Sequence, residues 1–243
     1  MKVTIIGYWG AYPAAGSASS GYLFEKDGFS LLVDCGSGVL SRLQQLKKVD
    51  ELDAVILSHY HHDHIADIGP LQYAWLVQNS LNDRNESLPI YGHQEDEDKF
   101  DMLTHQYTKG VPYDPEKPLE IGPFSIEFQK THHPVPCYGM RISDGEETAV
   151  YTADTSYFKE WSAFAKNANL LITDTNFYKG MDGKKAGHMT STEAATIADE
   201  ANVQTLWLSH LPHFGQLTKL RQEAEDVFHG TIQLAEEGMT WSK

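Results

Sequence analysis

The sequence predicts an α/β fold in which two related halves form one sandwich, and two observations carry this prediction. Short apolar runs typical of buried strands recur along the chain, and many of them alternate with helical patterns. A meander-like group of strands followed by strand–helix alternation occurs in both halves. The 243 residues could form one large α/β domain or two smaller ones, and we expect one domain over 1–243.

The first half begins with strands and a hairpin. Asp27-Gly28 between two apolar runs is a hairpin turn signal, and a loop of small residues, 13–20, precedes this hairpin. The segment 109–118 contains three prolines and predicts a loop. The expected strands are 2–6, 22–25, 29–33, 54–57 and 89–91, and the expected helices are 39–46, one from the loop after 57 to about Gln78, and 94–107.

The second half continues with strands and then with alternating elements. Thr190 and Glu193 have the spacing of a capping box, which fixes the start of a helix. Apolar patterns assign Trp75, Trp161 and Trp207 to the core, and Cys35 and Cys137 are expected to be buried thiols. The expected strands are 124–129, 137–142, 148–151, 170–173, 205–208 and 231–234, and the expected helices are 158–165, 193–201 and 217–228.

The charge balance limits the partners. The chain has 19 basic and 34 acidic side chains, for a formal net charge of -15. Such a surface repels phosphate backbones at long range, so we do not expect a large nucleic acid as a partner. A small phosphodiester or another small-molecule substrate remains compatible with this charge, because the field inside a metal pocket is local and positive.

The sequence gives only limited information on the cellular location and the oligomeric state of the protein. The first residues contain no apolar run long enough for a signal peptide, and no stretch approaches a membrane span, so we expect a cytoplasmic protein without membrane contact. A homodimer is compatible with the sequence, which does not fix the oligomeric state.

The most informative motif is His59-Tyr60-His61-His62-Asp63-His64, which directly follows the apolar run 54–57. A buried strand that ends in ligands places them at the rim of a sheet, where a ligand crevice can form. Imidazoles suit divalent transition metals, and Asp63 adds a hard oxygen donor. The alternative is a polar loop that is rich in histidine by chance, since the chain has 12 histidines. We predict a metal site.

Three further residues are candidate ligands beside strand ends. His133 precedes the predicted strand 137–142, Asp154 follows the apolar run 149–153, and His210 follows the strand 205–208. A residue at such a position is often only a turn or cap residue. Asp154, with two oxygens, could bridge two metals. A pair of divalent ions about 3.5–4 Å apart activates water and clamps both oxygens of a displacement, which indicates hydrolysis.

Taken in order, these motifs resemble those of the metallo-β-lactamase superfamily, in its ribonuclease Z-like branch. The resemblance covers almost the whole chain and implies a four-layer αββα sandwich. It rests on the loop before Ser19-Ser20-Gly21-Tyr22-Leu23, on Val33-Asp34-Cys35-Gly36, on 59–64, on 133–142, on Tyr151-Thr152-Ala153-Asp154-Thr155 and on Leu208-Ser209-His210.

The resemblance also implies a ligand set and two catalytic residues. Asp63 would orient or deprotonate the water between the metals, and His188 matches a histidine that donates a proton to the leaving oxygen. The alternative for His188 is a solvated loop histidine. Of the pair at 132 and 133, His133 is the implied ligand, and His132 is expected to pack nearby. The family pattern implies two Zn²⁺, with Mn²⁺ tolerated, one on His59, His61, His133 and Asp154, the other on Asp63, His64, Asp154 and His210.

The chain also departs from the ribonuclease Z pattern. No arm rich in glycine and proline lies between Asp154 and His188, and Ser17-Ala18 stand where a basic pair is common. Pro212-His213-Phe214 follow the last ligand, and His213 could either touch substrate or be a packed or exposed residue. We therefore predict a phosphodiesterase for small or cyclic phosphodiesters. We expect the two metals and the backbone N–H groups of 16–20 to bind the phosphate of the substrate. The alternatives are ribonuclease Z-type RNA processing, lactone or thioester hydrolysis, and a non-catalytic metal-binding protein.

Overall fold

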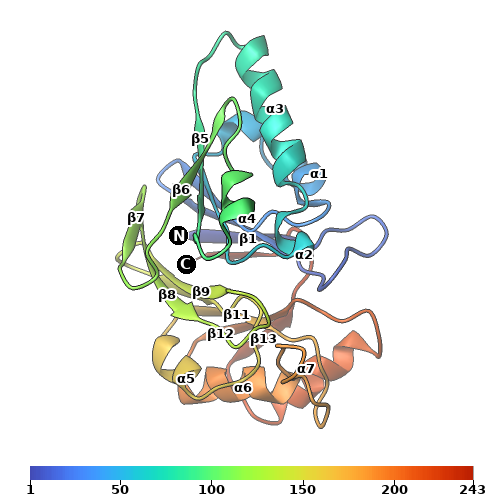
Figure 1. Ribbon diagram of the computed structural model, residues 1–243. Helices are drawn as coiled ribbons and strands as arrows, with labels where there is room; N and C mark the ends of the chain where they lie inside the picture. Colours follow the sequence, from blue (N-terminus) through green and yellow to red (C-terminus); the bar gives the residue numbers. More distant parts are fainter. Residues whose placement is uncertain (243) are drawn as a thin grey trace. The chain divides into compact units, whose positions relative to one another are not determined.

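A computed structural model describes residues Met1 to Ser242 and divides the chain into two compact units (Figure 1). Unit 1 contains Met1–Asp114 together with the described residues from Glu237 on, and unit 2 contains Pro115–Glu236. Each unit is built on one mixed seven-stranded sheet with helices. The prediction of an α/β fold with two related halves is therefore confirmed.

The sheet of unit 1 has the order β14-β1-β2-β3-β4-β5-β6. Its first strands are antiparallel, and the pairs from β3 to β6 are parallel. Asp27 and Gly28 both have positive φ in the turn between β2 and β3, as a tight hairpin requires. The strands are β1 Lys2–Gly7, β2 Gly21–Lys26, β3 Phe29–Val33, β4 Ala54–Ile56, β5 Leu88–Gly92, β6 Thr108–Pro112 and β14 Thr240–Ser242.

Helices of unit 1 pack their apolar side chains onto this sheet. Leu43 and Trp75 belong to one buried cluster with the strand residues Leu32, Val55 and Ile90. This packing fixes the parallel strands β3 and β4, whose carboxyl ends meet at the same edge of the sheet. The helices are α1 Val39–Leu43, the 3₁₀ turn η1 Val49–Glu51, α2 His62–Ile65, α3 Ile68–Leu81 and α4 Glu97–Asp101.

The sheet of unit 2 has the order β13-β12-β11-β10-β9-β8-β7. β7 to β10 form an antiparallel meander, and β10 to β13 run parallel. Trp161 and Trp207 are fully buried, as predicted. The strands are β7 Leu119–Ile121, β8 Phe124–Lys130, β9 Tyr138–Ser143, β10 Thr148–Tyr151, β11 Leu170–Asp174, β12 Thr205–Ser209 and β13 Thr231–Leu234.

The helices of unit 2 are α5 Glu160–Phe164, α6 Ser191–Glu200 and α7 Leu217–Glu225. The predicted capping box starts α6: the Thr190 side chain accepts from the N–H of Glu193, and the Glu193 carboxylate accepts from the N–H of Thr190. Both cysteines are buried free thiols, also as predicted. Within the described chain, no helix is both long enough and apolar enough to cross a membrane.

Some predicted elements were wrong. The proline-containing segment 109–118 is not a loop throughout, because its beginning forms β6. β6 lies at the end of the sheet order, and an edge strand tolerates proline because one side of its backbone needs no partner. The helix expected over 94–107 is only α4, since a turn at His105 and Thr108 leads into β6. The helix after the metal motif is divided into α2 and α3, and β7 and β14 were not predicted.

Candidate metal centre

In unit 1, the end of β4 and the short helix α2 bring the histidines of the motif together. The ring centroid of His59 lies 4.8 Å from that of His61 and 4.1 Å from that of His64. One turn of helix after an extended His61 produces this grouping, because α2 carries Asp63 and His64 back towards the strand end. Unit 1 therefore presents three imidazoles and a carboxylate within one short segment.

Asp34, directly after β3, orients this cluster. One carboxylate oxygen, Oδ2, lies 2.8 Å from Nδ1 of His64 and accepts a hydrogen bond from the Ser58 hydroxyl, while Oδ1 accepts from the Ser58 N–H. The Ser58 hydroxyl in turn lies 3.0 Å from Nδ1 of His59. Because both Nδ1 atoms are held in this way, Nε2 of His59 and of His64 are the nitrogens oriented for metal binding, a common arrangement around metal-binding histidines.

The backbone after β3 also fixes the position of Asp63. The N–H of Cys35 donates to the His64 carbonyl at 2.7 Å, and a Cβ atom on Gly36 would stand 1.9 Å from the Asp63 carbonyl oxygen. Only glycine permits this approach. On the side chain, Oδ2 of Asp63 accepts from the N–H of Ala11 at 2.8 Å. Asp63 is thus held at both its backbone and its carboxylate.

In unit 2, the parallel strands β10, β11 and β12 end at one edge and carry a second cluster. The two oxygens of Asp154 face different imidazoles: Oδ1 lies 3.3 Å from Nε2 of His210, and Oδ2 lies 3.8 Å from Nε2 of His133. Nδ1 of His133 lies 3.1 Å from the carbonyl oxygen of Gly187, which directs its Nε2 towards Asp154. This is the arrangement that a bridging carboxylate requires.

Asp174, the last residue of β11, joins His188 to this cluster. Its Oδ2 lies 2.7 Å from Nδ1 of His188, and its Oδ1 lies 3.4 Å from Nδ1 of His210. The two imidazoles stack at a centroid distance of 5.0 Å. Asp154, Asp174, His188 and His210 each place one donor atom within 4.8 Å of the others.

The charges in this group shift its proton affinities. Burial alone would lower the pKa of His188, but the Asp174 carboxylate outweighs it and raises that pKa above its ordinary value. Burial alone would raise the pKa of Asp174, but His188 and His210 outweigh it and lower that pKa. Asp174 is therefore the charged partner that favours the protonated form of His188.

The donor atoms of each cluster fit a divalent transition metal. They are imidazole nitrogens and carboxylate oxygens, which suit zinc and also accommodate manganese. A thiolate ligand is not offered by Cys35, because burial, with the carboxylates of Asp67 and Asp34, raises the pKa of its thiol well above the ordinary value.

Two important residues were not assigned by the sequence analysis. Asp34 stood in a quoted motif without a role, and Asp174 was not singled out at all. The signal for both was the one used for Asp154, namely a carboxylate at or just past the end of an apolar run.

Two of the strand-end residues have an unusual backbone conformation. Asp34 has a φ of 59° and His210 has a φ of 49°, a conformation that is costly for residues other than glycine.

Other histidines lie mostly as expected. His132 packs its ring against Phe158 at a centroid distance of 4.2 Å, and His213 is exposed. In the loop 16–20, the N–H of Ser17 donates to the carbonyl oxygen of Ala14 and the N–H of Ser19 donates to the carbonyl oxygen of Ser37. These two amides therefore make contacts within the protein, and phosphate binding by this loop stays a prediction.

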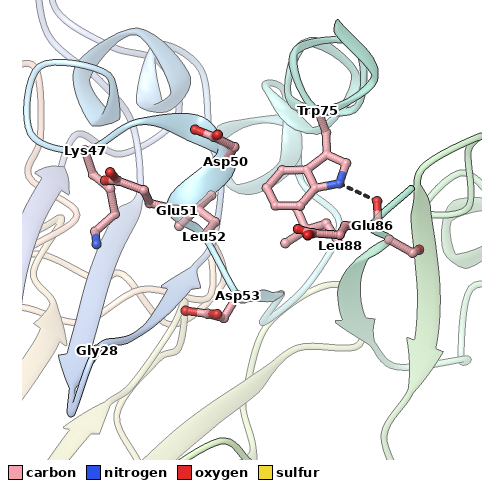
Figure 2. A pocket seen from close by; sticks show the side chains of 10 residues that line it. Gly28, Lys47, Asp50, Glu51, Leu52, Asp53, Trp75, Glu86 and Leu88 are labelled. Atoms are coloured by element: carbon pink, nitrogen blue, oxygen red, sulfur yellow. Dashed lines mark hydrogen bonds between the residues drawn. The ribbon is translucent and has the colours of Figure 1, made fainter. Parts of the chain in front are cut away.

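A cavity of about 740 Å³ in unit 1 differs in character from these clusters (Figure 2). Its lining contains carboxylates but no histidine. The carboxylates hold the surrounding loops: Asp53 accepts from the N–H of Ser30, and Asp50 pairs with Arg84. Trp75 donates from its indole to the carbonyl oxygen of Glu86, as Figure 2 shows. We therefore interpret this cavity as structural.

Comparisons with known proteins show one family, and solved structures at low identity share its fold. A family model described as "Beta-lactamase superfamily domain" matches residues 30–211. The protein "Probable metallo-hydrolase YhfI" of Bacillus subtilis is 55% identical over 99% of both chains, and its crystal structure superposes with a TM-score of 0.98 over 99% of this chain and 98% of that one. A "Ribonuclease Z" of Metallosphaera sedula is 26% identical over 94% of each chain. The crystal structure of a "New Diphosphatase from the PhnP Family" gives a TM-score of 0.77 at 17% identity, covering 100% of this chain and 97% of that one.

Proposed function

Because the chain belongs to the metallo-β-lactamase superfamily and is a metallo-hydrolase of that family, we propose that it is a dinuclear phosphodiesterase for small or cyclic phosphodiesters. The observation that carries this proposal is the pair formed by His188 and Asp174 beside Asp154 and His210. A phosphodiester with a poor leaving oxygen needs a proton at that oxygen, and this pair holds a proton next to candidate metal ligands.

We assign the metal ligands as the family resemblance implies. One ion would be held by His59, His61, His133 and Asp154, and the other by Asp63, His64, Asp154 and His210. When bound, two Zn²⁺ or Mn²⁺ ions supply positive charge to the phosphate and lower the pKa of water towards about 7. The orientation of His59 and His64 by Asp34, and of His133 by Gly187, supports this assignment.

Side chains of the protein would then activate the attacking water and protonate the leaving oxygen. Asp63, held by the N–H of Ala11, orients or deprotonates the attacking water through its carboxylate. His188 holds its Nδ1 proton towards Asp174, so Nε2 is the atom that delivers a proton to the leaving oxygen. Asp174 keeps the imidazole in the required orientation and favours its protonated form.

Ribonuclease Z-type RNA processing is the second candidate, favoured by the similarity to the Metallosphaera sedula enzyme over 94% of both chains. The charge of -15 argues against it, because a large RNA needs many contacts from basic side chains. Between Asp154 and His188, the described chain forms α5, β11 and a connecting segment, and the sequence there contains no arm rich in glycine and proline. We retain small phosphodiesters as the substrate and the cytoplasm as the expected location.

The test compares two substrates side by side. Protein loaded with zinc or with manganese would be assayed for kcat/KM on an aryl phosphodiester and on a precursor tRNA with a 3′ trailer. We expect hydrolysis of the small diester and weak or absent cleavage of the tRNA. Efficient, site-specific trimming of the tRNA would establish the second candidate instead, and inactivity on every phosphodiester would refute both.

A further inference from the structure

A cavity of about 430 Å³ in unit 2 lies between the segment after β11 and the turn before α7. Tyr178, Met181 and Phe214 supply its apolar surface, and Lys179 and Lys219 supply two ammonium groups. Its volume is within the range of small-molecule sites, roughly 300–1,000 Å³. Phe214 is 45% exposed and Met181 is 44% exposed, so this apolar surface is accessible in the described chain.

A row of aromatic rings connects this cavity with the candidate proton donor. The ring of Phe177 lies 6.3 Å from that of His188 and 6.2 Å from that of Phe214, centroid to centroid. The ring of Phe214 lies 5.8 Å from that of Tyr178. A ligand that places a ring against Phe214 could therefore place its reacting group at His188.

The walls of the cavity are held in place. The Tyr178 hydroxyl donates to the carbonyl oxygen of Phe214 at 2.9 Å, and the N–H of Lys179 donates to the Glu223 carboxylate of α7 at 2.8 Å. Gly215 has a φ of 76°, and a Cβ atom there would stand 2.5 Å from the Tyr178 hydroxyl oxygen. The glycine thus allows the turn to lie directly against the tyrosine ring. Rigid aromatic walls reduce the entropy that is lost when a ligand binds.

The chemistry of this surface favours a planar ring attached to an anion. Aromatic side chains stack on planar ligands, and the two lysines attract negative charge on a protein whose net charge is -15. The Lys219 ammonium lies 5.8 Å from the centroid of the Tyr178 ring. Both lysines have acidic neighbours, Asp226 and Glu223, at 3.7 and 3.6 Å, but the lysine side chains are more than half exposed, so these pairs are weak.

We propose that this cavity binds a planar aromatic substituent of the phosphodiester substrate. The substituent stacks on Phe214 and Tyr178 while its phosphate lies at His188. This inference rests on the proposed function and narrows the substrate class to phosphodiesters that carry an aromatic ring, either a simple aryl group or a nucleobase.

The experiment compares how tightly diesters with and without aromatic rings occupy the site. Dimethyl, dicyclohexyl and diphenyl phosphate, and thymidine 5′-methyl phosphate, are tested as competitive inhibitors of the hydrolysis of methyl p-nitrophenyl phosphate by the metal-loaded wild-type protein. The inhibition constant of diphenyl phosphate should be roughly tenfold lower than those of dicyclohexyl and dimethyl phosphate, since stacking contributes an effect of that order. A still lower constant for the thymidine ester would identify a nucleobase, and equal constants for diphenyl and dicyclohexyl phosphate would refute stacking.

Phe214→Ala should abolish the preference for diphenyl phosphate and leave the inhibition constant of dimethyl phosphate within about twofold, because Phe214 is half exposed and contributes little to the core. Phe214→Leu keeps apolar bulk without a ring and should also lose the preference. Tyr73→Ala, which removes an aromatic ring of α3 that is 64% exposed, is the matched control and should change nothing. A preference that survives in Phe214→Ala would overturn the inference.

The two proposals fail in different ways. Absence of hydrolysis of methyl p-nitrophenyl phosphate by the wild-type protein would count against the phosphodiesterase function alone. Calorimetric binding of diphenyl phosphate and dimethyl phosphate then tests the cavity without turnover. Tighter binding of diphenyl phosphate that disappears in Phe214→Ala would support the subsite, and equal binding of the two diesters would refute it.

Discussion

Nδ1 of His188 lies 2.7 Å from Oδ2 of Asp174, and this contact connects the last residue of β11 with the loop before α6. Because the carboxylate is buried and charged, it fixes the orientation of the ring and favours its protonated form. The first prediction follows from this contact.

His188→Ala should retain the bound metals and reduce kcat by roughly 10²–10⁴-fold on substrates with poor leaving groups. The reduction should become small for p-nitrophenyl esters, whose leaving group needs no proton. A series of aryl esters that differ in leaving-group pKa measures this dependence. Equal losses across the series would show that His188 positions the substrate and does not donate a proton.

Asp174→Asn should reproduce the same leaving-group dependence with a smaller loss, because the amide keeps a hydrogen-bonding group near His188 but removes the charge. The metal content should be measured in parallel, since Oδ1 of Asp174 also lies 3.4 Å from His210. A full loss of metal in this variant would assign Asp174 to the metal ligands instead.

Asp34→Asn should weaken metal binding by about 10–100-fold without removing any proposed ligand, because Asp34 orients the rings of His64 and, through Ser58, of His59. Competition with a chelator of known affinity measures the change. Asp53→Asn serves as the control, because it removes a carboxylate that accepts from the N–H of Ser30 in β3 and lies outside the proposed ligand set. Unchanged affinity in Asp34→Asn would refute the role of Asp34.

The metal content itself should be two divalent ions per chain after reconstitution with zinc. His59→Ala should lose mainly one ion, whereas Asp154→Ala should weaken both, because the proposed bridge uses both of its oxygens. Elemental analysis of the purified variants checks these numbers. A stoichiometry of one ion in the wild-type protein would contradict the proposed ligand set.

Gly36→Ala should destabilise the protein by several kcal/mol, because the added Cβ would meet the Asp63 backbone at 1.9 Å and no side-chain movement relieves that contact. Gly28→Ala is a useful comparison, since its Cβ meets nothing within 4 Å and only the φ of 84° opposes it. Denaturant unfolding of both variants gives the two free-energy changes. A smaller loss in Gly36→Ala than in Gly28→Ala would contradict this interpretation.

The sequence predicted the strands better than the helix ends. Runs such as 29–33 and 205–208 are mostly apolar because those strands are buried, so periodicity was not needed to find them. The segment 94–107 combines acidic residues with apolar ones, and its helix ends early because tertiary contacts, including the bonds from Gln72 to the carbonyls of Met102 and Leu103, fix the chain after α4. Such contacts are not visible in a local pattern.

Among the site residues, the histidines were easier to predict than the acids that orient them. A histidine after a strand is rare enough to attract notice, whereas Asp34 and Asp174 resemble ordinary strand-end carboxylates until the hydrogen bonds to His64 and His188 are seen. The catalytic roles of Asp63 and His188 and the ligand set stay predictions for the experiments above.

The pairing of β14 with β1 joins residues 240–242 to residues 2–4, almost the full length of the chain apart. During translation, β1 therefore cannot pair with β14 until every strand of unit 2 has been synthesised. During that interval, one edge of an apolar strand that contains Val3, Ile5 and Ile6 presents open backbone groups, which makes the nascent chain prone to edge-to-edge association. Deletion of β14 would make that transient exposure permanent. The deletion should lower the solubility of the protein without changing the metal-binding residues.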